Sequence, residues 1–562
     1  MIFAGRKVKK QIAAMMTLVL MVSAIPAMAA DTGTRQNEFG NLRGLQFADW
    51  VVMGIYAAGM LAVGVYFARR QKNMEEFFLA GRSAKPFMVG MSLFASLIST
   101  ISYLAWPGEM IKHGPIIMVG IVSIPVIYLL TGYALIPFFM KLPITSAYEI
   151  LERRFGMRAR LLGSTIFVAT RLVWMGLFMY LAGKAIVVML GWPQWVISYV
   201  IIITGVVTVV YSSIGGFSAV IITDVFQAFI LMTGAVLTVV CISISMGGVG
   251  SWWPHSWASN WDQQPFFSLN PEVRVTVVGT MVAYFVWWIC TACSDQMAIQ
   301  RYLATKDAKS ARRAFLINNT ADVLVSILLA LVGFALLGYF RANPQLLDGK
   351  DPIANADFLF PHYIANFLPM GVGGLVVSGM FAAAMGCLSS GISSVTAVLK
   401  TDFWDRFGKR SSGEGHQVKS AKVIVVIIGI VVLLLSTQIG KVPGNILEVA
   451  NKTVNLFVGP MGALFVMALF MPWVDEFGAI AGTIYGCAVA MIVAYWDVIT
   501  GRGGLSFQWI MLASLIASLI VGSTLSLVPI KAKSPGSRIL RFGTAAIPLV
   551  ALVALILHIG KV

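Results

Sequence analysis

Charge is scarce in this sequence. Of its 562 residues only 12% are Asp, Glu, Lys or Arg, about half of the share found in soluble domains. This scarcity excludes a soluble enzyme, a disordered protein and a nucleic-acid-binding protein. The five cysteines all lie in apolar stretches, so we expect neither a disulfide framework nor a metal site. The sequence also lacks a catalytic triad, a zinc-ligand spacing and a phosphate loop, so we do not expect an enzyme.

The chain is rich in hydrophobic residues, which make up 58% of it. Many of its apolar segments reach the length of about 20 residues that a membrane-spanning helix needs. We therefore predict an all-α integral membrane protein with fourteen transmembrane helices. The predicted spans are 48–69, 84–111, 115–139, 158–187, 193–212, 217–246, 274–298, 312–340, 368–400, 419–439, 446–470, 477–498, 508–530 and 542–560.

The first 29 residues predict a signal peptide. A basic stretch at 6–10 precedes an apolar run at 12–24, and Ala27-Met28-Ala29 resembles a cleavage site. An uncleaved anchor is the alternative, and in both cases the segment 30–47 begins outside the cytoplasm. Most of the 41 Lys and Arg residues then fall in the alternate loops that face the cytoplasm, as the positive-inside rule requires. This predicts a bacterial-type inner-membrane protein with both mature termini outside.

The spans divide into a leading helix at 48–69, a ten-helix transport core at 84–470 and peripheral helices at 477–562. The first and sixth core spans are unusually polar: 84–111 carries a cluster of hydroxyl residues, and 274–298 ends in Asp295 and Gln296. In inverted-repeat transporters, interrupted helices expose backbone groups to ions and substrates at the midplane. We therefore predict a five-plus-five inverted repeat with these two helices interrupted, although Ser and Thr also serve as plain packing residues in membranes.

Three ionisable residues fall inside predicted spans, namely Arg171, Asp224 and Asp322. Such residues are costly in a bilayer and are functional candidates. Arg171 and Asp322 would form a structural pair in one interpretation. In the other, the guanidinium of Arg171 binds a substrate carboxylate, because it offers a bidentate fork.

Small residues line one face of the span 368–400, where Ala383, Gly386 or Cys387, and Ser390 recur at helical spacing. Ser389 and Ser390 add oxygens, and hard cations prefer oxygen ligands. The stretch therefore predicts either a sodium site or a seam for close helix packing.

Six stretches resemble the sodium:solute symporter family. They are FFLAGRSAKPF (77–87), LPITSAYEILERRFG (142–156), YSSIGGFSAVIITDVFQAFIL (211–231), DQMAIQRYLATKDAKSARRA (295–314), LPMGVGGLVVSGMFAAAM (368–385) and SSGISSVTAVLKTDFW (389–404). The resemblance implies the inverted-repeat fold of the leucine transporter. The leading helix and the fourteen spans resemble the sugar-carrying branch in topology.

The resemblance implies a main sodium site made by the carbonyl groups of Ala95 and Ile98 and by the positions of Ala383, Gly386 and Cys387. Family members usually carry Ser or Thr at the last two positions, so two hydroxyl ligands are missing here. Backbone carbonyls and water would have to replace them for this site to bind sodium.

A second sodium site, which some members have, would use Asp224, Ser389 and Ser390, and all three are present. Coupling by sodium would then rely on these residues. Proton coupling through Asp224 is the alternative.

The resemblance also bears on the solute. Galactose carriers have Asn, Lys and Gln at the positions of Trp288, Asp322 and Ser102, so we do not expect a simple hexose. Sialic acid carriers hold a carboxylate with hydroxyls matching Ser99 and Ser102 and an arginine matching Arg171. This implies an organic acid, an amino acid or an acidic sugar. The predicted substrate-binding residues are Ser99, Thr100, Ser102, Arg171, Trp288, Thr291 and Asp322.

We therefore predict a secondary active transporter that couples cation entry, with sodium ahead of protons, to uptake of a small polar, carboxylated solute. A transporter-like sensor without flux is the alternative from another functional class. The expected partners are the solute and the lipid bilayer, without nucleic acid, and the sequence does not specify an oligomeric state. The cytoplasmic loop with Arg301 and Arg313 is expected to contribute little to specificity.

Overall fold

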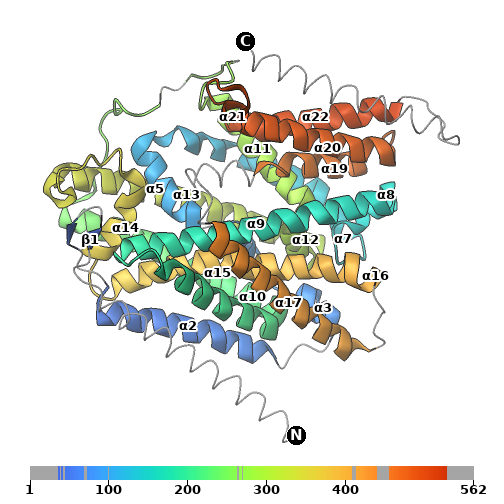
Figure 1. Ribbon diagram of the computed structural model, residues 1–562, viewed down its shortest axis with the longest axis horizontal. Coiled ribbons are helices and arrows are strands. Elements are labelled where there is room, and N and C mark those ends of the chain that lie inside the picture. The colour runs from blue at the N-terminus through green and yellow to red at the C-terminus, as the bar shows by residue number, and fades with distance from the viewer. Residues whose placement is uncertain are drawn as a thin grey trace, which may run out of the picture.

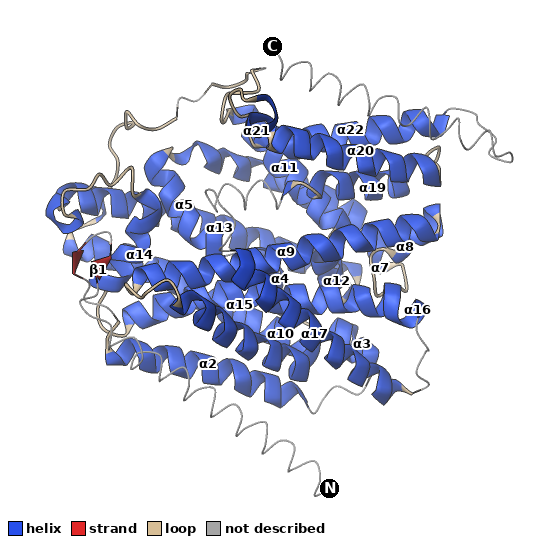
Figure 2. Cartoon of the chain, in the orientation of Figure 1, coloured by secondary structure: helices blue, strands red, loops and turns tan. Residues whose placement is uncertain are grey.

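The computed structural model describes residues 36–37, 40–41, 45–68, 73–98, 100–262, 265–268, 270–407, 413–439 and 455–527. Within these residues the chain is helical (Figure 2), apart from a small hairpin of β1 (Gln36–Asn37) and β2 (Gly40–Asn41). The predicted all-α class is therefore confirmed. The predicted signal peptide and the last predicted span, 542–560, lie outside the described residues.

Long helices run side by side through the molecule, with β1 and α14 at one end and α8 and α16 at the other (Figure 1). The elements of the first half are α2 (Phe47–Ala68), α3 (Met74–Leu79), η1 (Ala80–Arg82), α4 (Pro86–Leu97), α5 (Thr100–Lys112), η2 (Pro115–Ser123), α6 (Ile124–Leu130), η3 (Thr131–Leu135), α7 (Ile136–Met140), α8 (Glu149–Phe155), α9 (Met157–Met189), α10 (Val196–Ser245) and η4 (Val249–Ser251).

The second half is also made of helices, and its last helices form a layer at the top of Figure 1. Its elements are α11 (Val277–Ser294), α12 (Gln296–Leu303), α13 (Ala308–Ala342), η5 (Pro344–Leu347), α14 (Ala356–Asn366), α15 (Val372–Val398), η6 (Leu399–Trp404), α16 (Asp405–Phe407), α17 (Glu414–Ile439), α19 (Val458–Phe470), α20 (Glu476–Ala494), α21 (Trp496–Thr500) and α22 (Gln508–Leu527).

Ten helices of the described chain are long and apolar enough to cross a membrane, or eleven if the bent pair α4 and α5 counts as one span. The difference from the fourteen predicted spans has identifiable sources. The spans 193–212 and 217–246 are joined in α10, and α19 covers only 13 residues of the span 446–470.

Helix α10 contains a break that matches the boundary between two predicted spans. Its 50 residues would extend about 75 Å as one straight helix, far more than the hydrocarbon thickness of about 30 Å. Gly216 has φ 56° and ψ −161°, a conformation open to glycine because it lacks a Cβ. The helix direction therefore changes at Gly216.

Both interruptions that the sequence predicts are present. Helix α4 ends at Leu97, Ile98 is extended with ψ 135°, and the helical axes on either side differ by 63°. Helix α11 ends at Ser294, and Asp295 is extended with ψ 119°. The carboxylate of Asp295 accepts the backbone N–H of Met297 at 2.8 Å and so caps α12.

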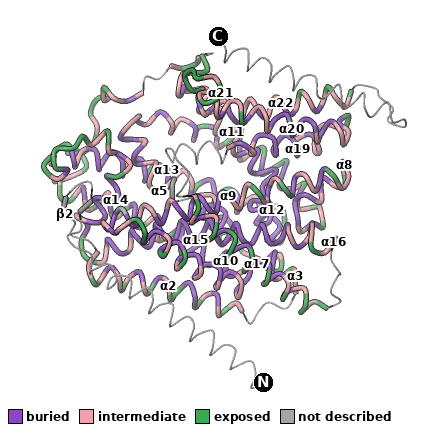
Figure 3. Tube along the Cα trace, in the orientation of Figure 1, coloured by how far each residue is buried: buried purple, intermediate pink, exposed green. Residues whose placement is uncertain are grey.

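Helix α15 is the central element, and buried residues gather along it and α10 (Figure 3). Its small residues allow other helices to approach. A Cβ on Gly374 would lie 2.5 Å from Cα of Asp49 in α2. The Asp49 carboxylate accepts the backbone N–H groups of Gly371 and Gly374 at 2.9 and 2.7 Å. The leading helix therefore caps the start of α15 and packs closely against it.

A buried ionic cluster joins the start of α9 to the turn η6 that follows the end of α15. Asp402, in the π-helical turn η6, accepts hydrogen bonds from Arg160 at 2.5 Å, from Ser146 at 2.9 Å and from Ser164. Arg160 also pairs with Glu152 of α8 at 2.5 Å. Partial burial opposes ionisation of Glu152, but the hydrogen bonds and charges of Arg160 and Arg406 outweigh it and lower its pKa. Asp402, within the stretch 389–404, thus connects η6 through Arg160 to α9 and α8.

Candidate functional site

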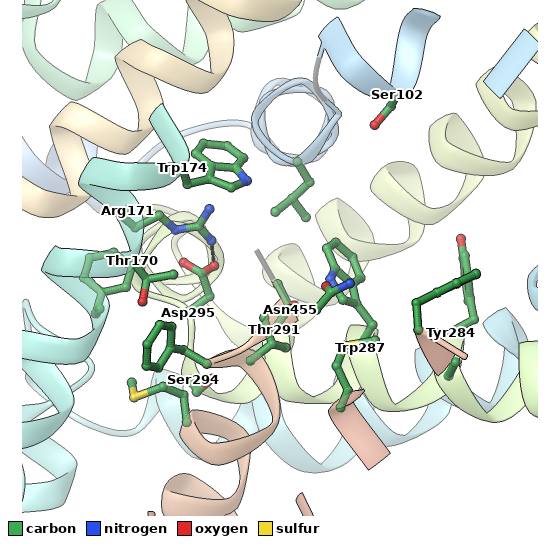
Figure 4. A pocket seen from close by; sticks show the side chains of 18 of the residues that line it. Ser102, Thr170, Arg171, Trp174, Tyr284, Trp287, Thr291, Ser294, Asp295 and Asn455 are labelled. Atoms are coloured by element: carbon green, nitrogen blue, oxygen red, sulfur yellow. Dashed lines mark ion pairs between the residues drawn. The ribbon is translucent and has the colours of Figure 1, made fainter. Parts of the chain in front are cut away.

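A cavity of about 380 Å³ lies between the two interrupted helices. Leu97 and Ser102 border it on one side, and Ser294 and Asp295 border it on the other. Helix α9 contributes the charged side chain of Arg171 (Figure 4). The remaining wall is largely apolar and aromatic, with Trp106, Phe167, Trp174, Phe178, Trp287 and Met461. This is the composition expected of a small-molecule site, with a few polar groups in an apolar enclosure.

Arg171 forms an ion pair with Asp295, and Figure 4 shows the two side chains pointing toward each other. Both side chains are nearly buried, with 12% and 10% of their surfaces exposed. The guanidinium also lies over the ring of Trp174, 4.5 Å from its centroid. A guanidinium has five N–H donors, so donors remain for a second carboxylate.

The pair of Arg171 with Asp322, one of the two interpretations of these residues, is replaced by the pair with Asp295. The carboxylate of Asp322 instead accepts the hydroxyl of Tyr284 at 2.5 Å. Tyr284 lines the cavity, and Asp322 lies behind it. The sequence predicted a carboxylate, Asp295, at an interrupted helix, but it did not predict that Arg171 is its partner.

The structure brings together only part of the predicted substrate set. Ser102, Arg171 and Thr291 line the cavity. Trp288 does not, because it faces Phe315 of α13 with its ring centroid 6.4 Å away, whereas Trp287 faces the cavity. The tryptophan that lines the cavity is therefore Trp287, and not Trp288 as the sequence had predicted. Ser99 and the side chain of Thr100 are outside the described part of the chain.

The positions of the predicted main sodium site do meet at the interruption of the first core helix. The thiol of Cys387 donates to the carbonyl of Ile98, with 3.0 Å between sulfur and oxygen. A Cβ on Gly386 would lie 3.2 Å from the carbonyl oxygen of Ala95. Ala383 is buried one turn earlier on α15. The Ile98 carbonyl thus accepts a hydrogen bond from a thiol, at a position where the resemblance implies a hydroxyl.

The predicted second sodium site holds a cation of the protein itself. Asp224 Oδ2 accepts Ser92 Oγ at 2.6 Å, Ser390 Oγ at 3.2 Å and Arg301 Nη2 at 2.9 Å. Arg301 also donates to Ser390 Oγ at 2.6 Å. The side chains of Arg301 and Asp224 are both fully buried. Ser389 instead donates to the carbonyl of Gly386 at 3.2 Å, so it is not a partner of Asp224.

This arrangement corrects two expectations. Arg301 does not lie in a cytoplasmic loop, because α12 resumes after Asp295 and carries it into the core. Asp224 and Ser390 are in contact, but Ser389 does not join them, because its hydroxyl donates to the carbonyl of Gly386. Helix α12 (Gln296–Leu303), which follows the interruption, carries Arg301 into the core. Hydropathy alone assigned Arg301 to a loop.

The sequence profile of the sodium:solute symporter family matches residues 77–486. The chain belongs to this family. It is therefore a sodium-coupled membrane transporter and not an enzyme. The curated sodium/sialic acid symporters NanT of Aliivibrio fischeri and SiaT of Proteus mirabilis are 28% and 29% identical to it. The alignments cover 79% and 80% of this symporter and 87% and 90% of those proteins.

A solved structure of similar fold is the substrate-bound outward-open state of a Na⁺-coupled sialic acid symporter. It shares 27% identity with this symporter at a TM-score of 0.74, and the match covers 86% of this chain and 98% of that chain.

Proposed function

We propose that this symporter takes up a small carboxylated solute together with sodium across the inner membrane. The observation that carries the proposal is Arg171, a guanidinium that reaches the cavity between the two interrupted helices. The sialic acid named for its relatives is a carboxylated sugar, which agrees with this chemistry. Ser102 and Thr291 would donate to the polar groups of the solute, and the aromatic wall would exclude water.

The proposed architecture is a five-plus-five inverted repeat within fourteen spans, preceded by a signal peptide, with both mature termini outside. The interruptions at Ile98 and Asp295 support it, because they fall within the first and sixth core spans. The concentration of Lys and Arg in alternate loops supports the orientation. Alternating access would then move one group of helices against another around the cavity.

Charge balance gives the coupling a physical basis. The Arg171–Asp295 and Arg301–Asp224 pairs each sum to zero, so an anionic solute adds one negative charge to the membrane interior. An uncompensated charge there is costly. One sodium ion bound nearby restores neutrality, so each of the two ligands makes binding of the other more favourable.

Uptake into liposomes that contain the purified symporter tests the proposal. An inward sodium gradient should drive saturable accumulation of sialic acid or of lactate, and should not drive accumulation of glucose. Replacing sodium by potassium at equal ionic strength should abolish accumulation. Uptake driven by a pH gradient without sodium, uptake of glucose alone, or binding without flux would contradict the proposal.

A further inference from the structure

Three oxygen atoms converge where residue 386 lacks a side chain. A Cβ placed on Gly386 would lie 2.9 Å from Gln227 Oε1, 3.2 Å from the carbonyl oxygen of Ala95 and 3.8 Å from Asp224 Oδ1. The three oxygens belong to two elements, Gln227 and Asp224 to α10 and Ala95 to α4 next to its interruption, and they face Gly386 of α15. The space beside Gly386 is thus bordered by a carboxamide, a carbonyl and a carboxylate oxygen.

Two of these oxygens are buried acceptors without a donor. Within the described residues, neither Gln227 Oε1 nor Asp224 Oδ1 accepts a hydrogen bond, and the two residues are only 2% and 0% exposed. Arg301, Ser92 and Ser390 all donate to the other carboxylate oxygen, Oδ2. A buried acceptor without a partner costs about 1–3 kcal/mol, so two neighbouring ones call for a ligand.

We propose that sodium binds in the space beside Gly386, held by Gln227 Oε1, Asp224 Oδ1 and the Ala95 carbonyl. The proposal rests on the sodium coupling of the proposed function. Hard cations take carboxylate, carboxamide and carbonyl oxygens, and all three kinds are present. Asp224 would bridge two cations, with Arg301 on Oδ2 and sodium on Oδ1, which explains how a carboxylate already paired with arginine still serves an ion.

Gln227 compensates in this arrangement for the hydroxyl that residue 386 lacks. A serine at 386 would place its Cβ under 3 Å from Gln227 Oε1, so the carboxamide and a hydroxyl at 386 compete for one space. The other family position without a hydroxyl, Cys387, donates its thiol to Ile98 and is a soft group that hard cations do not select. The proposed site therefore lies between the two predicted sodium sites and shares one ligand with each.

A sodium titration of thermal stability tests the site, with potassium keeping the ionic strength constant. The apparent sodium dissociation constant should rise about tenfold to a hundredfold in Gln227→Ala, as expected for one lost contact to a charged group. Adding Gly386→Ser to Gln227→Ala should recover most of the loss, because the hydroxyl then fills the space of the carboxamide. Adding Gly386→Ala should not, because it supplies a Cβ without an oxygen.

Gln300→Ala is the matched control. Gln300 is another fully buried glutamine whose Oε1 lacks a donor among the described residues, and it lies on α12. Its replacement should lower stability without changing the sodium dependence. An unchanged sodium dependence in Gln227→Ala, or equal recovery by Gly386→Ala and Gly386→Ser, would overturn the site and leave sodium coupling intact. A wild-type protein that sodium does not stabilise, and whose uptake ignores sodium, would overturn the site and the proposed function together.

Discussion

Replacing Asp224 by Asn should lower the stability of this symporter by about 3–5 kcal/mol, the cost typical of breaking a buried ion pair by removing one partner. Arg301 would be left as a fully buried cation whose remaining partners among the described residues are neutral. Its guanidinium would keep Ser92 and Ser390, at 3.0 and 2.6 Å, and the carbonyl of Met297 at 3.0 Å. Hydroxyl and carbonyl groups do not replace a carboxylate as a counter-charge. Thermal unfolding in detergent, with potassium as the sole cation of the buffer, measures the loss.

Asp322→Asn provides the matched control for this loss. Asp322 is also an aspartate within a helix of the bundle, but its bond is with the neutral hydroxyl of Tyr284, and no arginine depends on it among the described residues. It should therefore lose far less stability. Adding Arg301→Met to Asp224→Asn should recover most of the loss, because it removes the buried charge that Asp224→Asn leaves uncompensated. Equal losses in the two single variants, or no recovery in the double variant, would contradict a structural role for the pair.

This result bears on how coupling is tested. Asp224→Asn alone does not distinguish sodium from proton coupling, because it removes the partner of Arg301 and a proposed sodium ligand in one step. The Gln227 variants are more selective, since the carboxamide has weak contacts otherwise, with its nitrogen 3.5 Å from the hydroxyl of Tyr211 and 3.9 Å from the sulfur of Met60.

The sequence predicted the elements of the site better than their pairing. Hydroxyl residues in one apolar span, and Asp295 with Gln296 in another, correctly indicated two interrupted helices. The partner of Arg171 could not be predicted, because several acids, among them Asp224, Asp295 and Asp322, lie in the spans that follow and sequence order does not say which one faces it. The choice of Trp288 over Trp287 failed for a related reason. A helix that is apolar on all sides carries no amphipathic pattern that would fix its rotation.

Arg301 shows a different limit. Hydropathy ends the sixth core span at residue 298, so a charged residue just beyond it is assigned to a loop. The interruption at Asp295 means that the helix continues as α12 with every residue from Gln296 to Leu303 buried. Charged residues after a predicted interruption should therefore be treated as members of the core. Ligand compensation by Gln227 was hidden as well, because it depends on atoms from three helices that meet only in the folded chain.

Arg171→Gln should reduce the uptake of a carboxylated solute by about 30-fold to 1,000-fold, whereas Asp295→Asn should strengthen solute binding. Losing one partner of a desolvated charge pair typically costs about 2–4 kcal/mol, which sets the first range. Asp295 and the solute carboxylate both seek the guanidinium of Arg171. Asparagine caps a helix about as well as aspartate, so Asp295→Asn keeps α12 capped while it removes the competing charge.

The two variants should also separate in stability, and this is the sharper test. Without solute, Asp295→Asn leaves Arg171 unpaired in an apolar cavity, so its unfolding midpoint should fall. Adding sialic acid or lactate should then raise the midpoint more than in the wild type, because the solute becomes the sole counter-ion. Arg274→Gln is the control, since it removes an arginine bonded to Asp262 and Glu109 at 2.7 and 2.6 Å outside the lining of the cavity. Equal effects of Arg171→Gln and Arg274→Gln on uptake would show that Arg171 only supports the fold. Weaker solute binding in Asp295→Asn would show that Asp295 holds the solute rather than competing with it.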